Sequence, residues 1–301
     1  MENKKILLLG GNGYIGSVLY EYLRDKGYNV TNVDLCWFGK IHEFPTIECD
    51  YNDLKPDFIK KYSHIIVMAG HSAVSMCTDV KETFDNNVHK FVNLLSKTVP
   101  SQTVIYASTL AVYGNNEDIV DETYPLKNPI NAYDYSKMAR DQIANLFDVN
   151  TVGLRLGTVG GYSPNYRGEN LMNSISIDAI TKNQITISNP DLYRALLGIN
   201  DLCRAIEVVL SNNVSGHKIY NLSSVNKKII EFGETIQSIN NCELIVNDSM
   251  KTGYSFQSTS KRFEDDFNFT FNDTIESIFN GIQENYQNIK YSLKRRPVEY
   301  V

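Results

Sequence analysis

Short, continuous apolar runs alternate with longer segments of helical periodicity along the first half of the chain. An uninterrupted apolar run indicates a strand that is buried on both faces of a parallel sheet. The runs predicted as strands are 4–10, 28–34, 64–70, 102–108 and 151–157, and the predicted helices are 17–28, 85–99 and 129–147. This alternation predicts an α/β fold with a doubly wound parallel sheet of the Rossmann type.

The regular alternation ends near Gly160. The stretch 160–170 is rich in Gly, Pro, Asn and Ser, which is typical of a loop, and the elements after it alternate irregularly. A helix from about Asn200 and a strand at 217–223 indicate a return to the first domain. We therefore expect a Rossmann domain at residues 1–160, with a return segment near 195–224, and a smaller α/β substrate lobe at 161–301.

Charge and cysteine usage exclude several classes of protein. The 29 Lys and Arg against 35 Asp and Glu give a formal net charge of −6, whereas a general nucleic-acid binder carries a basic face. The five cysteines form no CxxC pair and the five histidines show no close ligand spacing, so we expect reduced thiols and no metal site. No apolar run is long enough for a signal peptide or a membrane span, which predicts a cytoplasmic protein with no membrane partner.

A glycine-rich turn follows the first predicted strand and opens the first predicted helix. The spacing of Gly10, Gly13 and Gly16 lets the chain turn sharply and lets a pyrophosphate approach the backbone at the helix N-terminus. Asp34 ends the second predicted strand, where a carboxylate binds ribose hydroxyls and repels a 2′-phosphate. The pattern predicts a site for NAD rather than NADP. The alternatives are a plain tight turn at the glycines and a turn or cap role for Asp34.

A YxxxK pattern occurs at Tyr133 and Lys137. On a helix this spacing stacks the phenol and the ammonium group on one face, so the lysine can lower the pKa of the tyrosine. Three other pairs match the same pattern, namely Tyr22/Lys26, Tyr51/Lys55 and Tyr286/Lys290. Only Tyr133 lies on a predicted helix that follows a strand ending in hydroxyl groups, at Ser108 and Thr109. The pattern predicts an acid–base pair there and ordinary surface pairs elsewhere.

These motifs occur in a familiar order: the glycine turn, Asp34, the pair Asp50-Tyr51, Ala69-Gly70, the stretch 106–114, and Tyr133 with Lys137. In this order the chain resembles the extended short-chain dehydrogenase/reductase family, in its nucleotide-sugar epimerase and dehydratase branch. The stretch 69–88 is similar to the corresponding part of UDP-galactose 4-epimerases. The resemblance covers nearly the whole chain.

The resemblance implies a set of site residues. The catalytic residues would be Thr109, Tyr133 and Lys137. The cofactor NAD would contact Gly10, Gly13, Tyr14, Ile15, Gly16, Asp34, Asp50, Tyr51, Ala69, Gly70 and Asn86, together with Tyr133 and Lys137. The partner would be a nucleotide-diphosphate sugar, bound by Thr109, Arg167, Asn170, Asn173 and Arg194. The alternatives for the two arginines are ordinary ion pairs, of Arg194 with Asp191 or Asp201 and of Arg167 with Glu169.

Departures from the family pattern narrow the expected activity. In 4,6-dehydratases of this kind an acidic pair follows the catalytic hydroxyl, whereas this chain has Leu110 and Ala111. Enzymes that epimerise at C3 and C5 place a cysteine where Ala111 stands. We therefore expect NAD-dependent oxidation at C4 through a 4-keto sugar, by a 4-epimerase or 4-dehydrogenase of surface-glycan sugar synthesis. A 4-keto-sugar reductase and a catalytically inactive dinucleotide-binding regulator remain as alternatives.

The same resemblance implies a homodimer in which two helices of each subunit pair across a two-fold axis. These helices are 89–99 and 132–147, with apolar positions at Phe91, Leu94, Leu95, Met138 and Ile143. The alternative is that both apolar stripes face the sheet.

Overall fold

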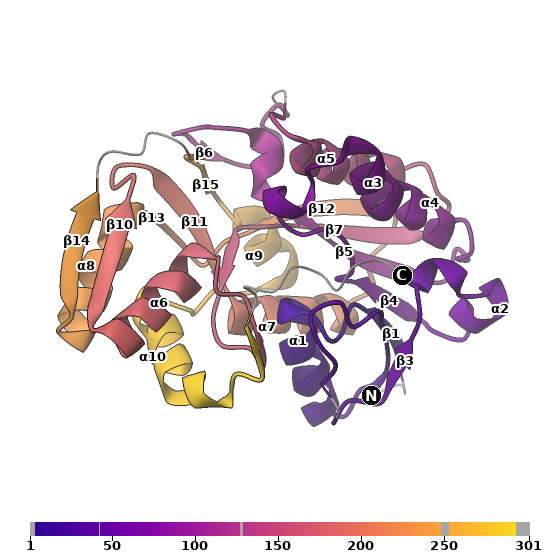
Figure 1. Cartoon of the computed structure of the whole chain (residues 1–301). Coiled ribbons are helices and arrows are strands. Elements are labelled where there is room, and N and C mark those ends of the chain that lie inside the picture. Colours follow the sequence, from indigo (N-terminus) through magenta and orange to yellow (C-terminus); the bar gives the residue numbers. More distant parts are fainter. Residues whose placement is uncertain (1–3, 42, 127–128, 248–252, 293–301) are drawn as a thin grey trace.

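A computed structural model describes residues 4–41, 43–126, 129–247 and 253–292. In these residues a seven-stranded, fully parallel sheet runs in the order β12-β7-β5-β4-β1-β2-β3 (Figure 1). The strands are β1 (Lys5–Leu9), β2 (Asn29–Asp34), β3 (Thr46–Glu48), β4 (His64–Val67), β5 (Thr103–Thr109), β7 (Asn150–Leu156) and β12 (His217–Leu222). The order reverses at β1, between β2 and β4, and this confirms the predicted doubly wound sheet.

Helices cover both faces of this sheet (Figure 1). Leu8 of β1 packs in one core with Leu19 and Ile206, whereas Leu7 packs in a second core with Phe91 and Val104. Since neighbouring residues of a strand point to opposite faces, both faces are apolar, as the continuous hydrophobic run predicts. The helices beside the sheet are α1 (Tyr14–Asp25), α7 (Ile199–Ser211) and α9 (Lys261–Phe267) on one face, and α3 (Val80–Phe84), α4 (Lys90–Leu95) and α5 (Ala132–Ala144) on the other; α2 (Pro56–Ile59) lies near β3 and β4.

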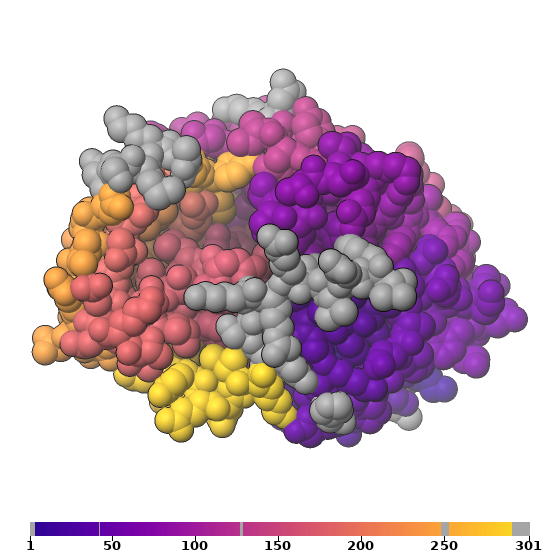
Figure 2. All heavy atoms as spheres, viewed as in Figure 1, coloured from indigo at the N-terminus to yellow at the C-terminus, as the bar shows by residue number. Residues whose placement is uncertain are grey.

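A smaller lobe has its own core, in which Met172, Phe232 and Phe279 are buried. Its strands are β8 (Thr158–Gly160), β11 (Tyr193–Gly198), β13 (Val225–Lys228), β10 (Gln184–Ser188) and β14 (Glu243–Asn247), and its helices are α6 (Leu171–Lys182), α8 (Ile229–Asn240) and α10 (Ile275–Asn285). Two short pairs, β6 (Ile119–Val120) with β15 (Gln257–Ser258) and β9 (Asn165–Tyr166) with β16 (Tyr291–Ser292), complete the described strands. Figure 2 shows the indigo and purple surface of the first lobe beside the salmon to yellow surface of the second.

The chain crosses between the lobes more than once. β11 pairs with β8 and β13 in the smaller lobe, and α7 and β12 then return to the large sheet. Where the domain boundary falls stays a prediction.

The structure corrects the dimer contact expected on the first of the two helices. Phe91, Leu94 and Leu95 are almost fully buried and pack against the strands of the large sheet. An apolar stripe of this kind can pack against a sheet or against a partner subunit, and in this structure it packs against the sheet. On α5, Met138 packs beside Leu110 and Val112, and Ile143 is half-buried. The homodimer itself stays a prediction.

No helix in the described part of the chain is long and apolar enough to cross a membrane. Within the same residues, no group of three or more His, Cys, Asp or Glu side chains is placed to hold a metal ion.

Candidate active site

The glycine turn lies at the carboxyl end of β1, where the sheet order reverses. Gly10 has a φ of +93°, and a Cβ atom there would lie 2.6 Å from the amide nitrogen of Ala69. A Cβ atom on Gly16 would lie only 1.9 Å from the carbonyl oxygen of Gly10, so the backbone of α1 packs directly against the backbone of the turn. Gly13 caps α1, whose first turn holds no acidic residue. These features fit the pyrophosphate of a dinucleotide, which needs close backbone approach and an unopposed helix N-terminus.

Asp34 lies beside this turn at the end of β2. Its two carboxylate oxygens accept hydrogen bonds from the amides of Asn12, at 2.8 Å, and Cys36, at 2.7 Å. Burial raises the pKa of the carboxyl group, and these two bonds oppose the effect. Asp34 therefore stabilises the conformation of the turn. Its carboxylate can accept further hydrogen bonds, and ribose hydroxyls are suitable donors.

The next expected cofactor residues lie at the end of β3. The Asp50 carboxylate accepts a bond from the amide of Asn52 and forms a 2.5 Å ion pair with Lys90. Tyr51 is buried, and this raises the pKa of its phenol to about 12. Both side chains thus have roles inside the protein, and a cofactor contact by either stays a prediction.

The loop after β4 is tied to the helices behind it by two asparagines. Gly70 has a φ of +132°, and the next amide, of His71, donates to the side-chain oxygens of both Asn86 and Asn87. Asn87 also donates to the carbonyl of His71 and to Ser136 on α5. The family resemblance implies Asn86 as a site residue, whereas no sequence pattern indicates Asn87. The cause is a π-helical turn at Asp85–His89, which points two successive side chains at one amide and has no sequence signature.

The predicted catalytic residues come together at the carboxyl end of β5 and the start of α5. Asn131 caps α5, and the hydroxyl of Thr109 lies close enough to the phenol of Tyr133 to lower its pKa. The ammonium nitrogen of Lys137 lies 5.6 Å from the centre of the Tyr133 ring. The helical spacing therefore places the phenol, the hydroxyl and the ammonium group in one cluster, as the YxxxK pattern predicts.

Burial controls the charges in this cluster. It lowers the pKa of Lys137 to about 7, and the neighbouring guanidinium of Arg140 acts in the same direction. Burial also raises the pKa of Tyr133, whereas the positive charge of Arg167 and the nearby hydroxyl of Thr109 lower it. Burial thus brings the pKa of Lys137 into the neutral range but moves that of Tyr133 away from it, and the charge that opposes the rise is that of Arg167 rather than that of Lys137, which the YxxxK spacing predicted. Formation of the phenolate therefore depends on positive charge close to the ring.

Arg167 links the two lobes above the catalytic cluster. Its guanidinium pairs with Glu169 at 2.8 Å, as the alternative interpretation predicted. It also donates to the hydroxyl of Ser72, at 3.0 Å, and to the carbonyl of Ser72, at 3.2 Å. The charge of Arg167 reaches Tyr133, and its partner Glu169 lines the pocket around Arg194, so Arg167 lies near both the reacting group and that pocket.

The two asparagines of α6 differ in position. Asn170 lines an open pocket and donates to the carbonyl of Val159. Asn173 is fully buried: it accepts from the amide of Gly161 and donates to the phenol of Tyr14 and the carbonyl of Arg167. This corrects the expected direct substrate contact of Asn173, whose amide is used to join α1 to α6.

The side chains beside the glycine turn belong to the same junction. The phenol of Tyr14 donates to the carbonyl of Gly161 and is buried, so this ring ties the turn to the smaller lobe. Ile15 is half-buried and packs against the large core. Any cofactor contact by these two residues would come from their backbone at the start of α1, and it stays a prediction.

Arg194 lines a pocket of about 420 Å³ in the smaller lobe, together with Asn170, Thr158, Ser174, Ser188 and Ile229. Its guanidinium carbon lies 4.8 Å from the centre of the Phe256 ring. The ion pairs offered as an alternative do not form, because Asp191 pairs with Lys228 and Asp201 with Arg204. Among the described residues no carboxylate pairs with Arg194, and burial lowers its pKa to about 10.

Comparison with known proteins places this arrangement in a family. Residues 6–223 match the model of the NAD dependent epimerase/dehydratase family. The chain belongs to this family. It is therefore an enzyme of the nucleotide-sugar epimerase and dehydratase type, and the expected cofactor, NAD, is confirmed by the family.

Curated relatives are distant but cover most of the chain. The protein CapI of Staphylococcus aureus is 25% identical over 78% of this chain and 83% of its own length. The UDP-glucose 4-epimerase of Corynebacterium glutamicum is 27% identical over 73% of this chain and 75% of its own.

Solved structures confirm the fold. MoeE5 in complex with UDP-glucuronic acid and NAD superimposes with a TM-score of 0.82 at 21% identity, covering 94% of this chain and 99% of that one. The UDP-glucose 4-epimerase of Thermotoga maritima gives 0.81 at 17% identity, covering 94% and 98%. TunA, an NDP-hexosamine 5,6-dehydratase, gives 0.81 at 19%, with the same coverage. Since epimerases and a dehydratase fit equally well, the fold does not decide the reaction.

Proposed function

We propose that this protein oxidises a nucleotide sugar at C4 to a 4-keto species and, as a 4-epimerase, reduces it again on the other face. The observation that carries the proposal is the cluster of Tyr133, Thr109 and Lys137, in a chain that also has the glycine turn and the pocket of Arg194. A dinucleotide site, together with a guanidinium that pairs with no carboxylate of the described residues, suits a substrate with a sugar next to a diphosphate.

The chain's own residues supply proton transfer and orientation. Tyr133, as the phenolate, takes the proton of the C4 hydroxyl, and Thr109 donates a hydrogen bond that stabilises the oxygen charge. Lys137 stabilises the phenolate with its positive charge, which is available around neutral pH since its pKa is about 7. Bound NAD supplies the hydride acceptor and donor.

The residues after Thr109 favour epimerisation or oxidation over dehydration. Leu110 and Ala111 form a buried 3₁₀ turn (Leu110–Tyr113), and neither side chain can donate or accept a proton. An elimination at C5 and C6 needs an acid and a base at those carbons, and this turn provides none. The same turn distinguishes the proposal from the dehydratases that share the fold.

The test measures product and cofactor together. The purified protein is denatured to quantify released NAD, and the native protein is incubated with UDP-glucose and with UDP-glucuronic acid, with products followed by NMR and bound NADH by absorbance. A 4-epimer without net NADH supports the epimerase. Stoichiometric NADH indicates a dehydrogenase, turnover of ketone with NADH only indicates a reductase, and no sugar-dependent absorbance change indicates a regulator.

The variant Tyr133→Phe tests the mechanism. It removes only the phenolic oxygen, so the protein should fold and retain NAD but lose turnover by about 10²–10⁴-fold, as expected for loss of a general acid–base group. Turnover near that of the wild type would contradict the assigned role of Tyr133.

A further inference from the structure

A segment of the smaller lobe, residues 253–258, reaches the start of the catalytic helix. The phenol of Tyr254 donates to the Asp134 carboxylate at 2.5 Å, and Asn131 donates to the same carboxylate oxygen at 2.8 Å. Asn131 also donates to the phenol of Tyr254, at 2.5 Å, and caps α5 through the amide of Asp134. Asp134 is fully buried and directly follows Tyr133. Tyr254, which is 120 positions away from Asp134, thus forms hydrogen bonds with two residues at the start of α5.

The other side of the segment lies against the strand that carries Arg194. The amide of Phe256 donates to the carbonyl of Tyr193, and the amide of Ala195 donates to the carbonyl of Phe256, both at 3.1 Å. The ring of Phe256 is the surface on which the guanidinium of Arg194 stacks. In between, the carbonyl of Ser255 accepts from the amide of Asn116 at 2.6 Å, and β15 pairs with β6 (Figure 1). One short segment therefore contacts the Arg194 strand and the Tyr133 helix.

The acid at position 134 is costly for the reaction and for the fold. Its negative charge raises the pKa of Tyr133, which opposes formation of the phenolate. Its second carboxylate oxygen is buried and has no hydrogen-bond partner in the described residues. A buried carboxylate with an incomplete set of partners needs a compensating role, since an apolar residue would avoid both costs.

We propose that Tyr254 and Asp134 are positioning residues: their hydrogen bond fixes the first turn of α5 against the Arg194 strand and so sets Tyr133 relative to the bound sugar. Only the kinetic test of this proposal rests on the proposed function, because it needs turnover of a nucleotide sugar. A nucleotide sugar held at Arg194 must present its C4 hydroxyl to Tyr133 across two lobes. A fixed distance between the strand and the helix is therefore a requirement of the chemistry.

The test compares two tyrosines that make the same kind of bond. Tyr254→Phe removes the phenol beside Asp134, and Tyr220→Phe removes the phenol that donates to Asp266 at 2.8 Å, between β12 and α9. We expect Tyr254→Phe to lower kcat at least tenfold, with KM and NAD content within threefold of the wild type. Tyr220→Phe should leave kcat and KM unchanged. Equal kcat losses in both variants, or a rise in KM without loss of kcat in Tyr254→Phe, would overturn the proposal.

Two variants of the acid separate positioning from folding. Asp134→Asn keeps an oxygen that accepts from Tyr254, whereas Asp134→Leu removes it, so the asparagine variant should turn over at least fivefold faster than the leucine variant. Equal turnover of the two would contradict the proposal.

Amide hydrogen exchange provides a readout that needs no activity. Tyr254→Phe should speed exchange at residues 131–137 and at the segment 253–258, and Tyr220→Phe should not. Unchanged exchange at residues 131–137 in Tyr254→Phe would overturn the proposal. If the wild type acts on no nucleotide sugar, the proposed function fails while the exchange experiment still decides whether this bond holds the helix.

Discussion

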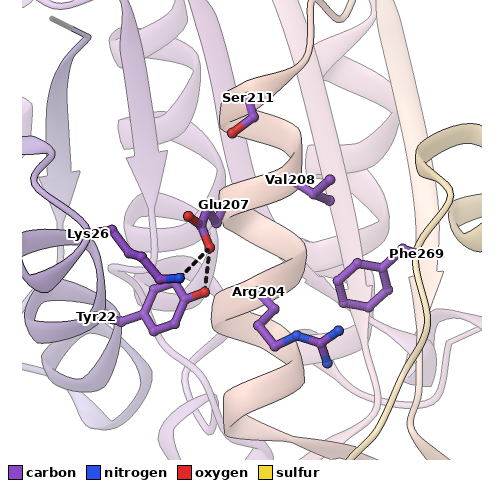
Figure 3. Close-up of a pocket in the computed structure, with 7 residues that line it drawn as sticks. All are labelled: Tyr22, Lys26, Arg204, Glu207, Val208, Ser211 and Phe269. Carbon is purple, nitrogen blue, oxygen red and sulfur yellow. Dashed lines mark hydrogen bonds and ion pairs between the residues drawn. The ribbon is translucent and has the colours of Figure 1, made fainter. Parts of the chain in front are cut away.

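Two hollows in the described part of the molecule hold an arginine that stacks on a phenylalanine. The first, of about 380 Å³, is an open depression beside α1 and α7, where Arg204 lies 4.8 Å from the ring of Phe269 (Figure 3). The second, of about 420 Å³, lies in the smaller lobe, where Arg194 lies 4.8 Å from the ring of Phe256. Size and stacking are nearly equal, so neither feature tells a ligand site from an ordinary surface.

The two hollows differ in how their charges are balanced. Arg204 pairs with Asp201 at 2.6 Å and donates to the carbonyl of Thr270 at 3.0 Å. In Figure 3, Tyr22 and Lys26 point to Glu207, which accepts a bond from the first and pairs with the second. Arg194 pairs with no carboxylate of the described residues. A charge without a partner is costly to bury, and a bound anion would offset that cost, so charge balance supports the second hollow as the proposed ligand site.

The largest expected effect comes from truncating each arginine. Arg194→Ala should weaken nucleotide-sugar binding by about 2–4 kcal/mol, which is roughly 30–1000-fold in Kd, because a charge-assisted pair with the diphosphate is lost. NAD content should not change, since the glycine turn lies in the other lobe. Titration calorimetry with the sugar nucleotide measures the effect.

Arg204→Ala is the matched control, because it removes the corresponding contact between an arginine and a phenylalanine, Phe269, in the first hollow. Its binding of the sugar nucleotide should equal that of the wild type. If Arg194→Ala instead loses NAD or stability while substrate affinity stays intact, Arg194 is structural and the two hollows do not differ in function.

The sequence predicts the cofactor side of the molecule well, because local rules determine it. A glycine turn between a strand and a helix has few conformations, and the crowding of Gly16 against Gly10 follows from that geometry. The spacing of Tyr133 and Lys137 likewise follows from the helical repeat. These predictions need no knowledge of distant contacts.

Contacts between distant segments could not be predicted in this way. Whether Arg194 is paired depends on Lys228 and Arg204, which take the two aspartates that flank it in sequence. The apolar stripe of Phe91 and Leu94 does not say whether it faces a sheet or a subunit, and the hydrogen bond between Tyr254 and Asp134 has no local signature. The side-chain contacts of the proposed substrate site could therefore not be predicted from the sequence.

A second, smaller effect concerns stability, where the two hollows should respond with opposite sign. Methionine keeps the apolar stem of arginine and removes the charge. Burial lowers the pKa of Arg194 to about 10, below its unfolded value, so the charge destabilises the folded protein at all pH values below about 10. Arg194→Met should raise the free energy of unfolding by about 1–2 kcal/mol at pH 7.

Arg204→Met should lower the free energy of unfolding by about 1–3 kcal/mol, because it removes a partner of the buried Asp201. Urea denaturation of both variants without added nucleotide measures the two changes. A loss of stability in Arg194→Met would show that the guanidinium already has its partner within the protein, and the contrast between the hollows would disappear.

The smallest effect is expected from Glu207→Gln in the first hollow. Glutamine keeps an oxygen that accepts from the phenol of Tyr22 and removes the charge that faces Lys26, whose side chain is half exposed and lies 3.9 Å away. Ion pairs of this kind contribute about 0–1 kcal/mol, because water screens them and ordering two long side chains costs entropy. The free energy of unfolding should therefore change by less than about 1 kcal/mol, while KM for the nucleotide sugar and NAD content stay at wild-type values. A threefold or larger change in KM would mean that the hollow at α1 and α7 is coupled to the active site, and charge balance alone would then no longer separate the two regions.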